Sequence, residues 1–269
     1  MESTVSITTV TVNLEKKQFV DFLNKFNEFD DDLTRFFIVV DSEGLELKIN
    51  TADKTVVKGL KLNTQTSLQK NEKIVWGIFS IKKILKFLGN LSNNIKITLH
   101  YTSFDTERLE KNVSSYTKEF GKTINFIVQY SISDEKLKIT QNGVSINQFN
   151  SFYPHIDAIK KVLDETGFAA KFKIDTKEFK KLYEISKISN ELKYEIKMDE
   201  SNIWCFNDSI NYKLDIKDYN FNSKINATIL PEKLIFIDSG EVDVTLTQTK
   251  FILKYENGFL VIALSVPTK

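Results

Sequence analysis

Residues 172–188 read FKIDTKEFKKLYEISKI, a short strand followed by an amphipathic helix, and residues 12–26 have the same pattern in VNLEKKQFVDFLNKF. Phe19 and Phe179 occupy equivalent places in the two helices and lie 160 positions apart. A repeat of that length spans a whole domain, because the units of solenoid proteins are only about 20–50 residues long. We therefore predict two domains of the same design.

The composition is that of a globular protein, with 269 residues of which 41% are hydrophobic and 27% are charged. The single Cys205 excludes an internal disulfide framework. The sequence has no apolar run of membrane-spanning length and no secretory leader, so we expect an intracellular, cytoplasmic protein without a membrane partner. The 37 basic and 36 acidic residues nearly cancel, and the placement of the charges therefore matters more than their total.

Most of the chain is predicted to be β-strand, because runs of β-branched and aromatic residues alternate with turn formers. The hairpin signals are Glu43-Gly44, Asn142-Gly143 and Asn257-Gly258. The predicted strands are 35–41, 45–50, 55–62, 73–79, 94–101 and 123–131 in the first half, and 192–198, 203–206, 209–216, 224–229, 241–247, 250–255 and 259–266 in the second.

Two segments depart from this strand pattern. Residues 105–118 are polar and charged and predict a long hairpin loop or insertion. Between residues 147 and 167 the strand pattern breaks, and a short helix is expected at 156–165. We therefore predict an α+β protein with an N-terminal domain at 1–148, a connector at 149–168 and a C-terminal domain at 169–269.

The helix that follows Ser80 has one apolar face and one purely cationic face, with no acidic residue between Ser80 and Asn90. Its inward positions are Ile81, Ile84, Leu85 and Leu88, and its outward positions are Lys82, Lys83 and Lys86.

The helix at 176–188 has a similar division, although Glu178 and Glu184 dilute its positive charge. Its inward positions are Phe179, Leu182, Tyr183 and Ser186, and its outward lysines are Lys177, Lys180, Lys181 and Lys187. Asp175 with Glu178 three residues later predicts a capping box at its start.

Two further helices are expected. The helix at 16–26 directs Phe19, Phe22, Leu23 and Phe26 inward, and its lysines Lys16, Lys17 and Lys25 are balanced in part by Asp21. A short, more apolar helix is expected at 230–237, where Pro231 suits the first turn.

The outward lysines have two interpretations. Any amphipathic helix needs a polar outer face, and lysine is a good helix former, so a merely solvated face explains each helix taken alone. If both halves fold alike, however, equivalent helices share one side of the sheets and their basic faces form a single cationic surface. Such a surface binds DNA phosphates through counterion release, without sequence readout.

The order of elements resembles the sliding clamps of DNA replication, particularly the phage type that forms trimeric rings. The resemblance is carried in the second half by 172–175, Phe179, Leu182, Ser186, 192–198, 201–207, 212–216, 225–238 and 240–247, and in the first half by 79–88 and 95–99, which take the places of 230–237 and 242–246. Phe152-Tyr153-Pro154 occupies the place of the aromatic-proline element that leads into the connector of phage clamps. The insertion at 105–118 and a partly helical connector depart from the phage pattern.

This resemblance implies a non-catalytic homotrimeric ring, with helices on its inner wall and sheets outside, that encircles double-stranded DNA. It implies a DNA polymerase and a clamp loader as partners, a role as processivity factor, and no cofactor or metal. The lysines expected on the inner wall are Lys16, Lys17, Lys82, Lys83, Lys86, Lys177, Lys180, Lys181 and Lys187. We expect Lys82, Lys83 and Lys86 to contribute most, because no acidic residue of their own helix offsets them.

Partner peptides of clamps dock in an apolar pocket beside the connector and the C-terminal end of the chain. The residues that this resemblance proposes for the pocket are Phe152, Tyr153, Phe168, Val266 and Pro267. Core packing between domains explains the same residues equally well.

An enzymatic function has little support in the sequence. His100 and His155 have no visible catalytic partner, and no basic neighbour activates Cys205. The sequence lacks a glycine-rich phosphate loop, a Cys-x-x-Cys pair and a His-Glu metal motif. Residues 30–32, three consecutive aspartates, are expected to form a solvated acidic turn.

Two functions from different classes therefore remain. The first is a ring that tethers a polymerase to DNA. The second is a monomeric or dimeric β-rich protein, either structural or a clamp-fold DNA-binding accessory that does not encircle DNA. The heavy use of Lys, Asn, Ile and Phe is compatible with an A/T-rich viral genome.

Overall fold

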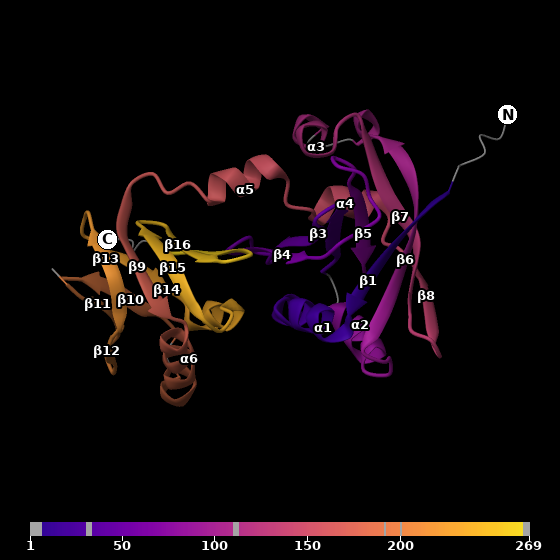
Figure 1. The fold of residues 1–269 in the computed structure, drawn as a ribbon. Helices are drawn as coiled ribbons and strands as arrows, with labels where there is room; N and C mark the ends of the chain where they lie inside the picture. The colour runs from indigo at the N-terminus through magenta and orange to yellow at the C-terminus, as the bar shows by residue number, and fades with distance from the viewer. Residues whose placement is uncertain (1–6, 31–33, 110–112, 191, 200, 266–269) are drawn as a thin grey trace. The chain divides into compact units, whose positions relative to one another are not determined.

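The computed structural model describes residues 7–30, 34–109, 113–190, 192–199 and 201–265 (Figure 1). The chain forms two compact units. The first comprises Met1–Ile49 and Gly59–Lys160, and the second comprises Asn50–Lys58 and Lys161–Lys269. In the described ranges no helix is long and apolar enough to span a membrane.

The first unit is built on a sheet in which the strands run in the order β1-β6-β7-β5-β2-β3-β4, with β8 paired to β7. All of its pairs with a described register are antiparallel except β5 with β7. Its strands are β1 (Thr8–Glu15), β2 (Phe36–Asp41), β3 (Gly44–Asn50), β4 (Val56–Asn63), β5 (Ile74–Ile78), β6 (Asn94–Asp105), β7 (Thr123–Ser133) and β8 (Lys138–Asn142). The first three residues of β4 belong to the second unit. Its helices are α1 (Lys16–Asn24), η1 (Asn27–Phe29), α2 (Ile81–Leu88), η2 (Thr106–Arg108), α3 (Val113–Phe120), α4 (Ile146–Phe152) and α5 (Ile156–Val162).

The second unit has a larger sheet in the order β17-β16-β15-β9-β13 and a smaller one in the order β12-β11-β10-β14. Its elements are β9 (Phe168–Asp175), α6 (Lys177–Ser189), β10 (Tyr194–Met198), β11 (Ile203–Phe206), β12 (Asn211–Lys213), β13 (Ile216–Phe221), β14 (Ala227–Ile229), η3 (Pro231–Phe236), β15 (Glu241–Thr247), β16 (Lys250–Tyr255) and β17 (Gly258–Ala263). Thr55 of the segment 50–58 joins this unit, because its carbonyl oxygen accepts a hydrogen bond from the Ala263 N–H.

The repeated strand–helix pattern is present in both units. In the first unit β1 leads into α1, and in the second β9 leads into α6. Phe19 and Phe179, the equivalent residues of the repeat, are both buried against the sheets of their own units. The predicted α+β class with sheets and helices in each half is confirmed.

Most predicted strands are present, and the exceptions have local causes. The predicted strand at 209–216 is divided into β12 and the start of β13, because Leu214 turns into the core between them. The hairpins at Glu43-Gly44 and Asn257-Gly258 are confirmed. The hairpin at Asn142-Gly143 is wrong, because β8 ends there and the chain continues to α4. A Cβ atom on Gly143 would lie 2.3 Å from the Ile127 carbonyl oxygen, so close approach of two backbones explains this glycine.

The prediction of a loop at 105–118 is wrong, because the described part of this segment contains η2 and most of α3. The helix forms because Tyr116 and Phe120 lie one turn apart and pack against α4. Tyr116 is fully buried, and its ring centroid lies 5.2 Å from that of Phe149. The polar composition of this segment concealed that apolar face.

The aromatic cluster between α3, α4 and the sheet is centred on Phe149, which is completely buried. The rings that surround Phe149 are Phe37, Tyr116, Phe120, Phe126 and Tyr153, with centroids 4.7–6.1 Å away. Tyr153 follows α4 and donates its hydroxyl to Glu119 Oε1 at 2.7 Å, and burial raises the pKa of this phenol. Because Glu119 belongs to α3, this buried bond joins α3 to the end of α4.

Candidate nucleic-acid interface

Helix α2 divides its residues between core and solvent as its spacing predicts. Ile81, Ile84 and Leu88 are buried, whereas its three lysines, Lys82, Lys83 and Lys86, are exposed. The helix begins at a true cap, because the Ser80 side chain accepts a hydrogen bond from the Lys83 N–H at 3.2 Å. The lysines therefore lie on a firmly anchored helix.

Sequence reasoning missed the acidic residue that lies at the start of α2. Asp30 is buried, and its carboxylate accepts hydrogen bonds from Ser80 Oγ at 2.9 Å and from the Lys82 N–H at 2.5 Å. A carboxylate is favourable there, because the first N–H groups of a helix are unpaired and carry partial positive charge. The Lys82 ammonium itself donates to the Asp30 carbonyl oxygen at 2.7 Å and not to the carboxylate, so Asp30 caps the helix and also ties down this lysine. Asp30 is also not part of a solvated turn, and residues 31 and 32 lie outside the described residues.

Helix α1 lies beside α2 in the first unit, as Figure 1 shows. Its apolar face is buried as expected. Lys16 is half-buried and donates from Nζ to the Leu91 carbonyl oxygen at 2.5 Å, whereas Lys17 is exposed. Of these two lysines, Lys17 is the one that extends into solvent.

The lysines of α6 are exposed but mostly matched by acids. Lys177 pairs with Asp175 at 3.3 Å, Lys181 with Glu178 at 2.7 Å and Lys187 with Glu184 at 3.1 Å. The hydrogen bond that each ammonium donates to its glutamate raises the pKa of Lys181 and likewise that of Lys187. Lys180 donates to Ser239 Oγ. The outer face of α6 is therefore nearly neutral, unlike that of α2.

The predicted capping box at the start of α6 is wrong. Thr176 is the N-cap residue and makes no side-chain cap, while Asp175 accepts a hydrogen bond from the Lys177 N–H at 3.0 Å. Glu178 turns away from the cap and accepts from the Tyr212 hydroxyl at 2.9 Å. Although burial alone would raise it, the hydrogen bonds from Lys181 and Tyr212 lower the pKa of Glu178.

The residues proposed for a partner-peptide pocket have different surroundings. Phe152 is 41% exposed at the end of α4, whereas Tyr153 is 4% exposed and packed in the aromatic cluster. Phe168 is half-buried, with Lys171 Nζ 4.9 Å from its ring centroid. Val266 and Pro267 lie outside the described residues.

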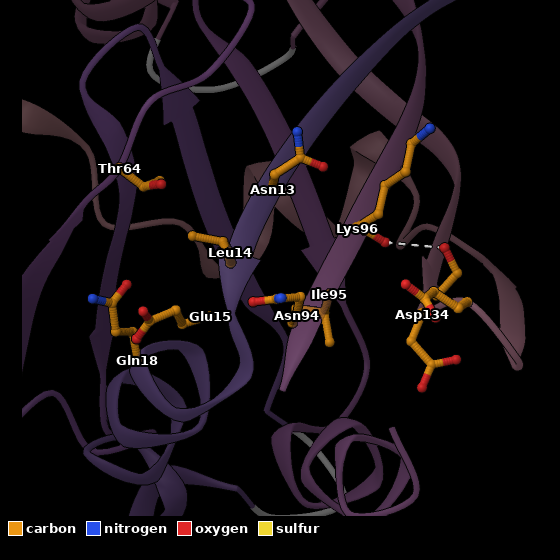
Figure 2. A pocket seen from close by; sticks show the side chains of 11 residues that line it. Asn13, Leu14, Glu15, Gln18, Thr64, Asn94, Ile95, Lys96 and Asp134 are labelled. Atoms are coloured by element: carbon orange, nitrogen blue, oxygen red, sulfur yellow. Dashed lines mark hydrogen bonds between the residues drawn. The ribbon is translucent and has the colours of Figure 1, made fainter. Parts of the chain in front are cut away.

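An open groove of about 650 Å³ lies on the first unit beside β1 and β6, and sequence reasoning gave no signal for it. Figure 2 shows Glu15 and Gln18 on one side and Asp134 on the other, with Asn94 and Ile95 between them. The Asp134 carboxylate accepts hydrogen bonds from the N–H groups of Ser92, Lys136 and Leu137, which lower its pKa. In the part of the chain that the structure describes, neither this groove nor any other place holds three or more side chains arranged to bind a metal.

Both histidines have local structural partners. His100 Nδ1 lies 2.9 Å from Thr9 Oγ1 in the β1–β6 pair. His155 Nδ1 accepts a hydrogen bond from the Ala158 N–H at 3.3 Å and thereby caps α5. These contacts explain the two imidazoles without a catalytic role.

The Cys205 thiol is buried in β11, and burial raises its pKa to about 12. We expect this thiol to resist iodoacetamide at pH 8 in the folded protein and to react rapidly in 6 M guanidinium chloride, because only the thiolate is nucleophilic. Mass spectrometry of the alkylated protein measures both rates. Comparable rates in the two conditions would contradict the burial of β11.

Comparisons with known proteins identify solved structures that share this architecture. No protein-family model matches the sequence, and no curated protein matches it either. Among solved structures, the proliferating cellular nuclear antigen (PCNA) of Entamoeba histolytica is similar at 12% identity, 96% coverage of this chain, 99% coverage of that chain and a TM-score of 0.62. The PCNA of Thermococcus kodakaraensis is similar with the same identity and coverages and a TM-score of 0.64. The fold that the order of elements suggested is therefore confirmed, and the chain has the fold of the PCNA sliding clamps along nearly its whole length.

Proposed function

We propose that this protein is a DNA sliding clamp, a homotrimeric ring that encircles duplex DNA and tethers a DNA polymerase as its processivity factor. The observation that carries the proposal is the clamp fold over 96% of the chain. Its proposed role is to hold the polymerase on the DNA while it slides along the duplex, and not to catalyse a reaction. The phage-type origin suggested by the sequence remains part of the proposal.

The cationic face of α2 supports DNA as the ligand. Among the described residues, Lys83 and Lys86 have no ion-pair partner, so their charges are free to meet phosphates. Each phosphate contact releases condensed counterions and carries no sequence information, which suits a protein that must slide. Because most charges of α6 are matched, we expect a smaller contribution to DNA binding from its lysines, Lys177, Lys180, Lys181 and Lys187.

The proposed domains are 1–148 and 169–269, joined by the connector at 149–168. We propose that the polymerase and the clamp loader dock with a peptide beside this connector, within the set Phe152, Tyr153, Phe168, Val266 and Pro267. Phe152 is the best-placed of the described members for contact, because its ring is exposed. Tyr153 supports the site indirectly through its packing against Phe149.

Open strand edges support assembly into a ring. Among described residues, β8 pairs with β7 alone and β13 pairs with β9 alone. Each strand therefore presents one row of backbone N–H and C=O groups that another chain can pair with. Two different edges on one chain give a head-to-tail contact, and such contacts close into a ring when the rotation fits.

Native mass spectrometry tests the oligomeric state. We expect a species of three times the 31.1 kDa chain mass at micromolar concentration. Proline in place of Thr140, the central residue of β8, is expected to shift the mass toward monomer, because proline cannot donate a ladder hydrogen bond. A wild-type protein that remains monomeric at all concentrations would favour the accessory protein that does not encircle DNA.

A further inference from the structure

We infer that Lys16 and Lys82 do not serve as DNA contacts and are positioning residues that lock α1 to α2, which leaves Lys17, Lys83 and Lys86 to meet phosphates. The assignment of the phosphate contacts rests on the proposed function. The assignment of the lock rests on contacts within the first unit alone.

At the start of α2, Lys82 donates two hydrogen bonds to Asp30, the residue that follows η1. Its backbone N–H donates to the Asp30 carboxylate at 2.5 Å, and its Nζ donates to the Asp30 carbonyl oxygen at 2.7 Å. Asp30 also accepts from Ser80 Oγ, so the cap residue and the second residue of α2 share one partner. The Lys82 side chain therefore bends back along the protein toward Asp30.

At the start of α1, Lys16 is bound twice by the segment that follows α2. Its backbone N–H donates to the Asn93 carbonyl oxygen at 2.7 Å, and its Nζ donates to the Leu91 carbonyl oxygen at 2.5 Å. Leu91 lies three residues beyond Leu88, the last residue of α2. Lys16 therefore ties the start of α1 to the segment that follows α2.

The two contacts are reciprocal, because the first residues of each helix bind the segment that follows the other. The helices consequently run in opposite directions and are tied at both ends. An ammonium group that already donates to a main-chain carbonyl must break that bond, or share its donors, to reach a phosphate. The neighbouring residues Lys17 and Lys83 are exposed and make no such side-chain contact among the described residues.

Adjacent lysines provide matched controls for the test. Methionine keeps the apolar stem of lysine and removes the ammonium, so Lys16→Met is compared with Lys17→Met, and Lys82→Met with Lys83→Met. Without DNA, we expect the two lock variants to melt roughly 2–4 °C lower than wild type and the two controls to melt within about 1 °C of it. Differential scanning calorimetry measures the shift.

The second readout is the salt dependence of binding to a short DNA duplex, measured by fluorescence anisotropy. We expect Lys17→Met and Lys83→Met each to reduce the slope of log affinity against log salt by about 1, and the lock variants to leave the slope unchanged. A Lys82→Met variant with wild-type melting and a reduced slope would overturn the inference. Absence of salt-dependent binding by the wild type would contradict the proposed function, while the melting comparison would still decide the lock.

Discussion

Replacement of Phe149 by alanine is expected to lower the free energy of unfolding by about 3–5 kcal/mol. Phe149 has no exposed surface and is enclosed by rings from the sheet, from α3 and from the end of α4. Loss of its ring leaves a cavity at the point where the insertion helix meets the sheet. Urea denaturation followed by circular dichroism measures the change.

Phe152, which lies three residues later on the same helix, is the matched control because its ring is exposed. We expect Phe152→Ala to change the free energy of unfolding by less than about 0.5 kcal/mol, as at other surface positions. Equal effects of the two substitutions would contradict the described packing of α3 and α4.

Reversal of both charges in the variant Lys83→Glu/Lys86→Glu is expected to weaken binding to duplex DNA at least about tenfold at 100 mM salt. Both side chains extend from a helix whose own described face holds no acid to compensate them. The slope of log affinity against log salt is expected to fall by about 2, because two phosphate contacts are lost. Fluorescence anisotropy over a range of salt concentrations measures both quantities.

The control reverses Lys193 and Lys224, which are exposed and lie outside the helices of the second unit. This variant has the same net charge as the first, so it separates a local contact from general electrostatic attraction. We expect it to keep most of the wild-type affinity and slope. Equal losses in the two variants would show that α2 is not the binding face.

The strands and the helix faces were predictable, because hydrophobic periodicity is a local property of the sequence. The buried stripe of α2 and the equivalent positions Phe19 and Phe179 follow directly from spacing. The two copies of one strand–helix pattern predicted two domains of one design, and the clamp-like fold was expected from the resemblance of the order of elements to the sliding clamps. The structural comparison confirms that fold.

The contacts made across long sequence distances were not predictable. Asp30 reaches the start of α2 from a position 50 residues earlier, and no local pattern marks it as a cap. The helix α3 was missed because its polar residues outnumber the two aromatic residues that anchor it. The capping box at α6 failed because Glu178 found a partner in Tyr212, 34 residues away. In each case a contact with a residue distant in the sequence decided the local structure.

The measurement that tests the proposed ring most directly compares retention on circular and linear DNA. The protein is dissociated by dilution and reassembled by concentration in the presence of nicked plasmid, so that assembly itself traps the DNA and no loader is required. The complex is then separated by gel filtration before and after a single restriction cut. We predict that the protein stays on the circle and leaves the linearised plasmid, because only a closed ring slides off free ends. Equal retention on both forms would contradict an encircling clamp.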